Sequence, residues 1–226
     1  MKKQKKRVLI TSIILVLAIT LLSINCGDED ESNNDTGSGN WIPLTNGSTW
    51  TYKGDFTNEL GMQVFVVEKI VIVGDTTVSG DGTYKSIIDS ITYTLKSSFI
   101  DSTWTEVTRE YLGKTSTFYK SGIPKMGGIT WYDILKIPAK VGDTWQPDPA
   151  DTTSYAKTEA FEDVKIDSLN KTFTNCVKVK SYELDEQSLD YKTQYAWFAD
   201  GVGLIKSTVE SPTASFTMQL TSYTIK

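Results

Sequence analysis

The stretch Gln63–Val73, QVFVVEKIVIV, decides the fold class of this chain. Apolar and polar side chains alternate along much of it and β-branched residues dominate, which is typical of a β-strand. Similar runs, separated by Gly, Asp, Ser and Asn, cover 83–95, 103–112, 115–120, 176–184, 192–198 and 215–225. No stretch beyond residue 40 keeps an apolar helical stripe for three turns. We therefore expect an all-β domain over 41–226, built as a curved antiparallel sheet.

The composition separates a basic start from an acidic remainder. The chain has 226 residues, 39% of them hydrophobic, which is enough apolar material for a folded core. Five of the 23 Lys and Arg precede Cys26, whereas all 28 Asp and Glu follow it. The remainder therefore carries 18 basic and 28 acidic side chains, a net charge of −10. Such a domain repels nucleic acid, so we expect no nucleic-acid partner.

The sequence offers little to catalysis. It contains no histidine, which removes the usual general base, the usual nucleophile triads and most zinc sites. Cys176 is the one cysteine beyond Cys26, and we interpret it as a small strand filler on the face opposite Phe173, Val177 and Val179. Carboxylate clusters such as Glu159/Glu162/Asp163 are interpreted as solvated charge. We expect no enzyme, no cofactor and no metal site.

Residues 1–25 have the pattern of a signal peptide. A basic start precedes an apolar run of about 15 residues, shorter than the roughly 20 that a spanning helix needs. Cys26 follows directly and resembles the lipidated cysteine of bacterial lipoproteins, although Ser23 and Asn25 stand where Leu and Gly or Ala are usual. The sequence thus predicts a palmitate-bearing lipid anchor at Cys26. A secretory signal cut elsewhere and an uncleaved anchor stay open as alternatives.

Residues 26–40 read as an acidic, flexible tether. They hold five carboxylates with Gly, Ser and Asn, and no apolar side chain follows Cys26. The acidic cluster resembles the surface-export signal of Bacteroidetes lipoproteins. We expect the protein in the bacterial cell envelope, anchored by lipid to the outer membrane; display on its outer surface and a solvated linker without an address stay open.

Two boxes of sequence suggest an internal repeat. Residues 43–50 (PLTNGSTW) and 138–145 (PAKVGDTW) share Pro, Gly, Thr and Trp at identical spacing. Weaker echoes follow in order, 82–86 against 171–175 and 111–113 against 198–201. We interpret them as duplicated halves, 41–137 and 138–226. In each box a tight turn with a Gly at positive φ would precede a strand whose Trp covers the core, which makes Trp50 and Trp145 equivalent.

These boxes, together with 171–179 (KTFTNCVKV) and 195–206 (YAWFADGVGLIK), resemble uncharacterised bacterial envelope lipoproteins with TapB-like domains. The resemblance implies a fold similar to the curved antiparallel half-barrel of the LolA and LolB lipoprotein carriers. It implies no catalytic residues. Within 195–206, the sequence predicts a turn or bulge at 201–203 between two strands.

Two classes of function fit these observations. The first is a non-enzymatic binding or scaffold domain, either for an apolar ligand in the concavity or for an envelope protein partner. The alternative is a surface-displayed carbohydrate binder or adhesin, which requires exposed aromatic residues at Trp104, Trp131, Tyr132 and Trp145.

Five Asp-Ser/Thr tripeptides, beginning at residues 75, 89, 101, 151 and 167, also resemble a Bacteroidetes O-glycosylation signal.

Overall fold

Twelve strands make up nearly all of the regular structure. The structure, a computed structural model, describes residues 39–57, 62–78, 82–97, 101–126, 128–149, 155–184, 191–210 and 215–226. The strands are β1 (Thr49–Thr57), β2 (Gln63–Val78), β3 (Gly82–Lys96), β4 (Asp101–Lys114), β5 (Phe118–Lys125), β6 (Gly128–Lys136), β7 (Thr144–Trp145), β8 (Tyr155–Ile166), β9 (Lys171–Leu184), β10 (Tyr191–Ala199), β11 (Gly203–Glu210) and β12 (Ser215–Thr224). A 3-10 turn, Asp167–Leu169, joins β8 to β9. The predicted all-β class is confirmed.

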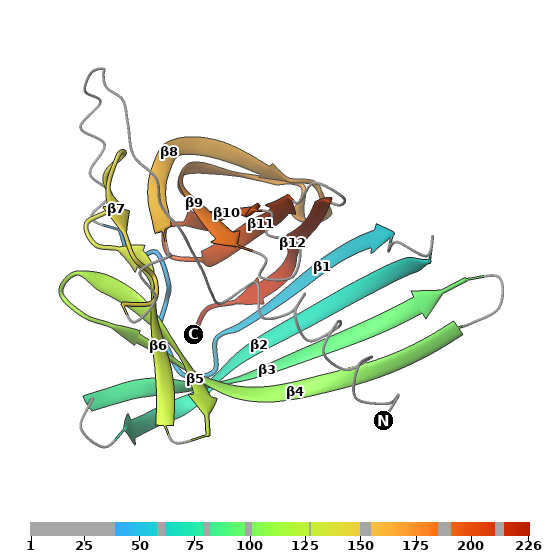
Figure 1. Cartoon of the computed structure of the whole chain (residues 1–226), viewed down its shortest axis with the longest axis horizontal. Coiled ribbons are helices and arrows are strands. Elements are labelled where there is room, and N and C mark those ends of the chain that lie inside the picture. The colour runs from blue at the N-terminus through green and yellow to red at the C-terminus, as the bar shows by residue number, and fades with distance from the viewer. Residues whose placement is uncertain are drawn as a thin grey trace.

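All strands belong to one antiparallel sheet. Their order is β6-β5-β4-β3-β2-β1-β12-β11-β10-β9-β8-β7, so every neighbouring pair except β1 and β12 is consecutive in the chain. The sheet curls strongly: β1 to β4 form one long wall, and β8 to β12 form a second curved wall (Figure 1). β6 and β7, although consecutive in the chain, lie at the two edges of the sheet.

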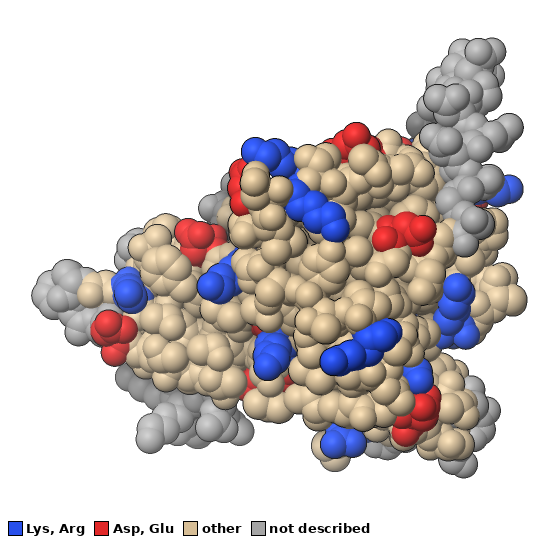
Figure 2. Space-filling model, turned by 180° about the vertical axis from the view of Figure 1, so that it is seen from behind, with Lys and Arg blue, Asp and Glu red and all other residues tan. Residues whose placement is uncertain are grey.

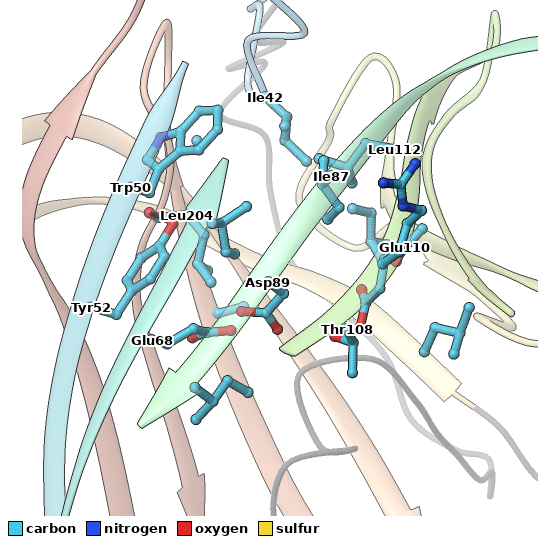
Figure 3. Close-up of a pocket in the computed structure, with 18 of the residues that line it drawn as sticks. Ile42, Trp50, Tyr52, Glu68, Ile87, Asp89, Thr108, Glu110, Leu112 and Leu204 are labelled. Atoms are coloured by element: carbon cyan, nitrogen blue, oxygen red, sulfur yellow. Dashed lines mark hydrogen bonds between the residues drawn. The ribbon is translucent and has the colours of Figure 1, made fainter. Parts of the chain in front are cut away.

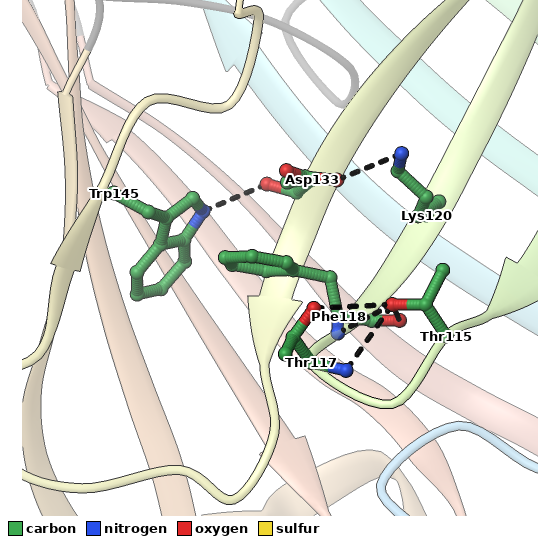
Figure 4. Close-up of polar contacts among 6 residues, drawn as sticks. All are labelled: Thr115, Thr117, Phe118, Lys120, Asp133 and Trp145. Carbon is green, nitrogen blue, oxygen red and sulfur yellow. Dashed lines mark hydrogen bonds and ion pairs between the residues drawn. The ribbon is translucent and has the colours of Figure 1, made fainter.

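The two edges meet, so the sheet is nearly closed. The Trp145 indole on β7 donates a hydrogen bond to the carbonyl oxygen of Asp133 on β6 at 2.8 Å. The Asp133 amide in turn donates to the carbonyl of Pro147 at 2.8 Å. Figure 4 shows the indole contact beside the ion pair between Lys120 and Asp133, whose charged atoms lie 3.4 Å apart. The sheet is therefore more closed than a half-barrel, because its edge strand β7 lies against the other edge strand, β6.

The two predicted turn boxes have the same backbone geometry. Gly47 and Gly142 have φ values of 84° and 88°, in the left-handed region that favours glycine. Each glycine amide donates to a carbonyl of the strand that pairs with the one its box opens. Gly47 donates to Ile72 on β2 at 2.8 Å, and Gly142 donates to Thr158 on β8 at 2.9 Å. The next residues, Ser48 and Asp143, each donate to the carbonyl three residues earlier at 3.1 Å. The boxes open strands β1 and β7, and the weaker echoes fall on β3 and β9 and at the ends of β4 and β10.

Six strands follow from each box, which is what duplicated halves would produce. The boundaries 41–137 and 138–226 of these halves stay a prediction. Residues 1–25, Cys26 and the tether up to residue 38 lie outside the described residues.

A β-bulge corrects the expected facing of β9. Pairing with β8 shifts between Glu162 and Val164, and Asn175 has a φ of 53°. The extra residue interrupts the alternation, so that Cys176 and Val177 are both fully buried. Cys176 joins the same core cluster as Phe173, whereas Val177 joins the other cluster. The expected opposition of Cys176 to Phe173 is therefore wrong, although the burial expected of a small filler is confirmed.

Two buried clusters hold the sheet together. The larger one contains Trp50, Tyr52 and Ile205, while the second contains Trp41, Leu135 and Trp145. Trp41 reaches across to Phe161, with ring centroids 6.0 Å apart. Both clusters lie within 41–226, so the predicted domain carries its whole described core.

Among the described residues, no helix is long and apolar enough to cross a membrane.

Candidate functional site

A cavity of about 450 Å³ lies inside the curled sheet. Its walls come from both halves: β1 to β6 on one side, and β10 and β11 on the other. Aliphatic and aromatic side chains form most of the lining, among them Ile70, Ile87, Ile91, Phe198 and Leu204. This size and lining are typical of sites that bind small apolar molecules.

Strand alternation explains which side chains reach the cavity. Successive side chains of a strand point to opposite faces of a sheet. On β2, Val64, Val66 and Ile72 are buried, and Glu68 is buried between them on the same face. On β3, Ile87, Asp89 and Ile91 lie on one buried face in the same way. An acidic residue therefore occupies an inward position on each of two neighbouring strands.

The register brings a third acid close to these two. Asp89 lies opposite Ile70 on β2, and Ile87 lies opposite Glu110 on β4. Glu68, Asp89 and Glu110 thus step diagonally across three strands. Diagonal neighbours are about 7–8 Å apart, within reach of long side chains. Figure 3 shows the three carboxylates directed into the same region of the pocket, with Tyr52 and Thr108 beside them.

Burial and mutual repulsion raise the pKa values of these acids. Desolvation is the largest cause for Glu68, followed by the charges of Asp89 and Glu110, and its pKa lies well above the usual value. Desolvation and then the charge of Glu110 raise the pKa of Asp89 to about 7. Desolvation also raises the pKa of Glu110. Near neutral pH the cluster therefore holds protons that exposed carboxyl groups would have lost.

Two aromatic residues of β1 link the walls of the cavity. The Trp50 indole donates to the carbonyl of Val202 at 2.6 Å, and the Tyr52 hydroxyl donates to the carbonyl of Leu204 at 2.9 Å. Both acceptors belong to the segment at the start of β11. The predicted turn at 201–203 is confirmed, with Gly201 and Gly203 at positive φ. These contacts fix the distance between the two halves at one end of the cavity.

The aromatic row that carbohydrate binding requires does not form. Tyr132 and Trp145 are buried, with 1% and 8% of their surfaces exposed. Trp104 and Trp131 are half-buried and stack on Tyr93 and Tyr84, with ring centroids 5.1 and 4.2 Å apart. Trp104 lies on the inner face of β4, since its register partner is the inward Tyr93. The four residues therefore do not form one exposed surface.

Acids that were interpreted as solvated charge have structural partners instead. Glu159 forms an ion pair with Lys178 at 2.9 Å, and Glu162 accepts a hydrogen bond from the Trp197 indole at 2.5 Å. Asp163 accepts a hydrogen bond from the Asn175 amide at the bulge, at 2.9 Å. Each of these three acids thus has a partner on β9 or β10.

The outer surface shows no concentrated charge on the face opposite that of Figure 1. Lys, Arg, Asp and Glu side chains are scattered over it among uncharged residues, and no broad patch of a single sign forms (Figure 2). No basic stripe of the kind that nucleic-acid binding needs is visible on this face.

The sequence analysis did not single out Glu68 and Asp89, the two acids that distinguish the cavity. Glu68 interrupts an apolar face made by Val64, Val66 and Ile70, and Asp89 stands two residues from Ile87 and Ile91. An acid within an apolar alternating face was the available signal. Asp89 also begins one of the tripeptides that resemble a glycosylation signal, and its own side chain is buried.

Comparison with known proteins gives two structural likenesses. The chain matches no family model and no curated protein. It is similar to a candidate lipoprotein from Parabacteroides distasonis ATCC 8503, with 13% identity, a TM-score of 0.45, and coverage of 82% of this chain and 99% of the other. It is also similar to a candidate exported protein with a YmcC-like fold from Bacteroides fragilis NCTC 9343, with 10% identity, a TM-score of 0.41, and coverage of 81% and 98%. At these values neither likeness assigns an activity to this chain.

Proposed function

We propose that this chain is a lipid-anchored protein of the bacterial cell envelope whose β-domain binds an apolar ligand and has no enzymatic activity. The observation that carries the binding role is the cavity of about 450 Å³ with its largely apolar lining. Burying an apolar molecule against such walls is favourable by about 25 cal/mol for each Å² removed from water. A scaffold role through an envelope protein partner would not need this interior space.

The anchoring part of the proposal depends on the sequence. The apolar run that ends at Cys26 and the acidic tether behind it support lipidation at this cysteine. We expect Cys26→Ala to abolish membrane attachment, measured by labelled palmitate incorporation and by membrane fractionation. Equal palmitate incorporation into the variant would contradict the anchor.

The domain should also fold without the anchor. Every described strand and both core clusters lie within 41–226. We expect that fragment to give a β-dominated circular dichroism spectrum and a cooperative thermal transition. A helical spectrum would contradict the all-β fold, and a featureless one would show that residues before 41 are needed for folding.

Native mass spectrometry of the full chain purified from its host tests the binding role. We expect a small apolar molecule to co-purify with the wild-type chain. Ala196→Phe, which adds a ring inside the cavity, should reduce this adduct strongly. Val107→Phe is the matched control. Val107 is 62% exposed, so this substitution adds the same ring outside the cavity.

Absence of any adduct in the wild type, or an adduct equally retained by Ala196→Phe with unchanged circular dichroism, would contradict ligand binding in the cavity. An adduct that proves to be a glycan would instead favour the carbohydrate-binding alternative.

A further inference from the structure

Two carboxyl oxygens are buried in the cavity without a partner. The side chains of Glu68 and Asp89 have 3% and 7% of their surfaces exposed. Neither Oε2 of Glu68 nor Oδ1 of Asp89 has a hydrogen-bond partner within the part of the chain that the structure describes. Buried polar atoms are nearly always hydrogen-bonded, because leaving one unpaired costs about 1–3 kcal/mol. The cavity thus holds two carboxyl oxygens that the described residues leave without a hydrogen bond.

Within the described ranges, no basic side chain forms an ion pair with these acids. Among the described residues that line the cavity, Arg109 is the one basic residue, against four acids: Glu68, Asp89, Glu106 and Glu110. Arg109 is exposed, and over the described ranges no ion pair joins it to an acid. The cavity therefore favours a positively charged group from outside and disfavours an anion.

The arrangement of the acids argues against a metal ion. No group of three or more acidic or cysteine side chains lies close enough to hold a metal, as far as the described residues extend. The acids step diagonally across β2, β3 and β4, and apolar side chains such as Ile70, Ile87 and Ile91 lie around them. A ligand that satisfies both features has a polar head that donates hydrogen bonds and an apolar body.

We propose that the cavity binds an amphiphile with an aliphatic body and a single primary ammonium head, which donates hydrogen bonds to Glu68 and Asp89. The body lies on the isoleucine-rich wall of the same cavity. An ammonium group has three donors and no acceptor, so it can serve both orphaned oxygens at once. Charge-assisted hydrogen bonds of this kind are roughly twice as strong as neutral ones. The proposal rests on the proposed function, because it names the ligand class for that cavity.

Binding should release a proton. Glu110 from β4, Glu68 from β2 and the hydroxyl groups of Tyr52 and Tyr93 lie near Asp89, and Arg109 is the one basic side chain among the described residues that line the cavity. The carboxyl group of Asp89 then keeps its proton up to about pH 7. An incoming ammonium favours the carboxylate, so the proton leaves to solvent while the ammonium keeps its own three. An uncharged head would cause no such release.

Photoaffinity labelling of the full chain in phosphatidylcholine nanodiscs separates the alternatives. Three octyl probes carry the same mid-chain diazirine and differ only in the head: ammonium, hydroxyl or carboxylate. Peptide mass spectrometry at pH 7 measures the labelled fraction of the cavity strands. We expect the ammonium probe to label them about tenfold more than the hydroxyl probe, and the carboxylate probe least.

Isosteric variants assign the preference to the two acids. The double variant Glu68→Gln with Asp89→Asn should lose the ammonium preference while still accepting the hydroxyl probe, which shows that the cavity is intact. Glu210→Gln, an exposed acid on β11, is the matched control and should behave as wild type. If the double variant accepts no probe, Asp89→Asn alone is the substitute, with a reduced ammonium preference expected.

Each other outcome overturns a defined part of the account. Equal labelling by all three probes, or an ammonium preference that persists in the double variant, contradicts the amine head but leaves apolar binding standing. A carboxylate preference contradicts it as well and directs attention to Arg109. Failure of every probe to label the cavity strands of the wild type contradicts the proposed function itself.

Discussion

The two tryptophan boxes have the same turn but different surroundings. Trp50 opens a nine-residue strand that is paired on both sides, by β2 and β12, and its indole reaches the turn at 201–203. Trp145 is the second residue of a two-residue edge strand, which is paired by β8 alone, and its indole reaches β6. A repeated sequence motif thus specifies a local geometry. The neighbours that the sheet supplies decide whether the motif borders the cavity or closes the edge.

Truncating the two tryptophans should give the largest effects. We expect Trp50→Ala to lower the free energy of unfolding by about 3–5 kcal/mol, as is usual for a buried aromatic residue. Trp145→Ala should cost less, about 2–3 kcal/mol, because an edge strand can relax around the void. Urea denaturation of both variants measures the difference. If either variant lost less than about 0.5 kcal/mol of unfolding free energy, as is usual for exposed positions, that tryptophan would not belong to the core.

The acids of the first half should make stability depend on pH. Asp89 has a pKa of about 7 in the folded chain and about 3.9 when unfolded, so the folded state binds more protons between these values. Stability is therefore full below about pH 4 and falls as the pH rises to about 7, by an amount on the order of 3 kcal/mol.

Asp89→Asn should reduce this slope without abolishing it, because burial also raises the pKa values of Glu68 and Glu110. Denaturant titrations at a series of pH values from 4 to 8 compare the variant with wild type. Asp163→Asn, which changes an exposed acid on β8, is the control. A slope of wild-type size in Asp89→Asn would show that Asp89 does not contribute to the pH dependence.

The turn glycines should give the smallest and most nearly equal effects. Gly47→Ala and Gly142→Ala each place a Cβ at a positive φ, which costs about 1–2 kcal/mol. A Cβ at Gly142 would meet nothing within 4 Å, and one at Gly47 would meet the flexible Lys226 side chain at 3.3 Å. The strain is therefore the same for both. Thermal melts that differ strongly between the variants would contradict the equivalence of the boxes.

The sequence predicted the fold class better than the site. Alternation located most of β2, β3, β4, β10 and β12, because a half-buried strand leaves that pattern directly. The two-residue β7 and the facing of β9 depend on sheet curvature and on a bulge at Asn175, which no periodicity shows. The cavity depends on the register between β2, β3 and β4. Only that register reveals that Glu68 and Asp89 meet.

A crystal structure of the full chain purified from its host, with its native ligand retained, tests the central claim most directly. The account predicts elongated electron density inside the cavity, with one end at hydrogen-bonding distance from the carboxylates of Glu68 and Asp89 and the rest along Ile70 and Ile91. Ordered water alone around the two carboxylates, or a collapsed interior in which they pair with Arg109, would contradict it.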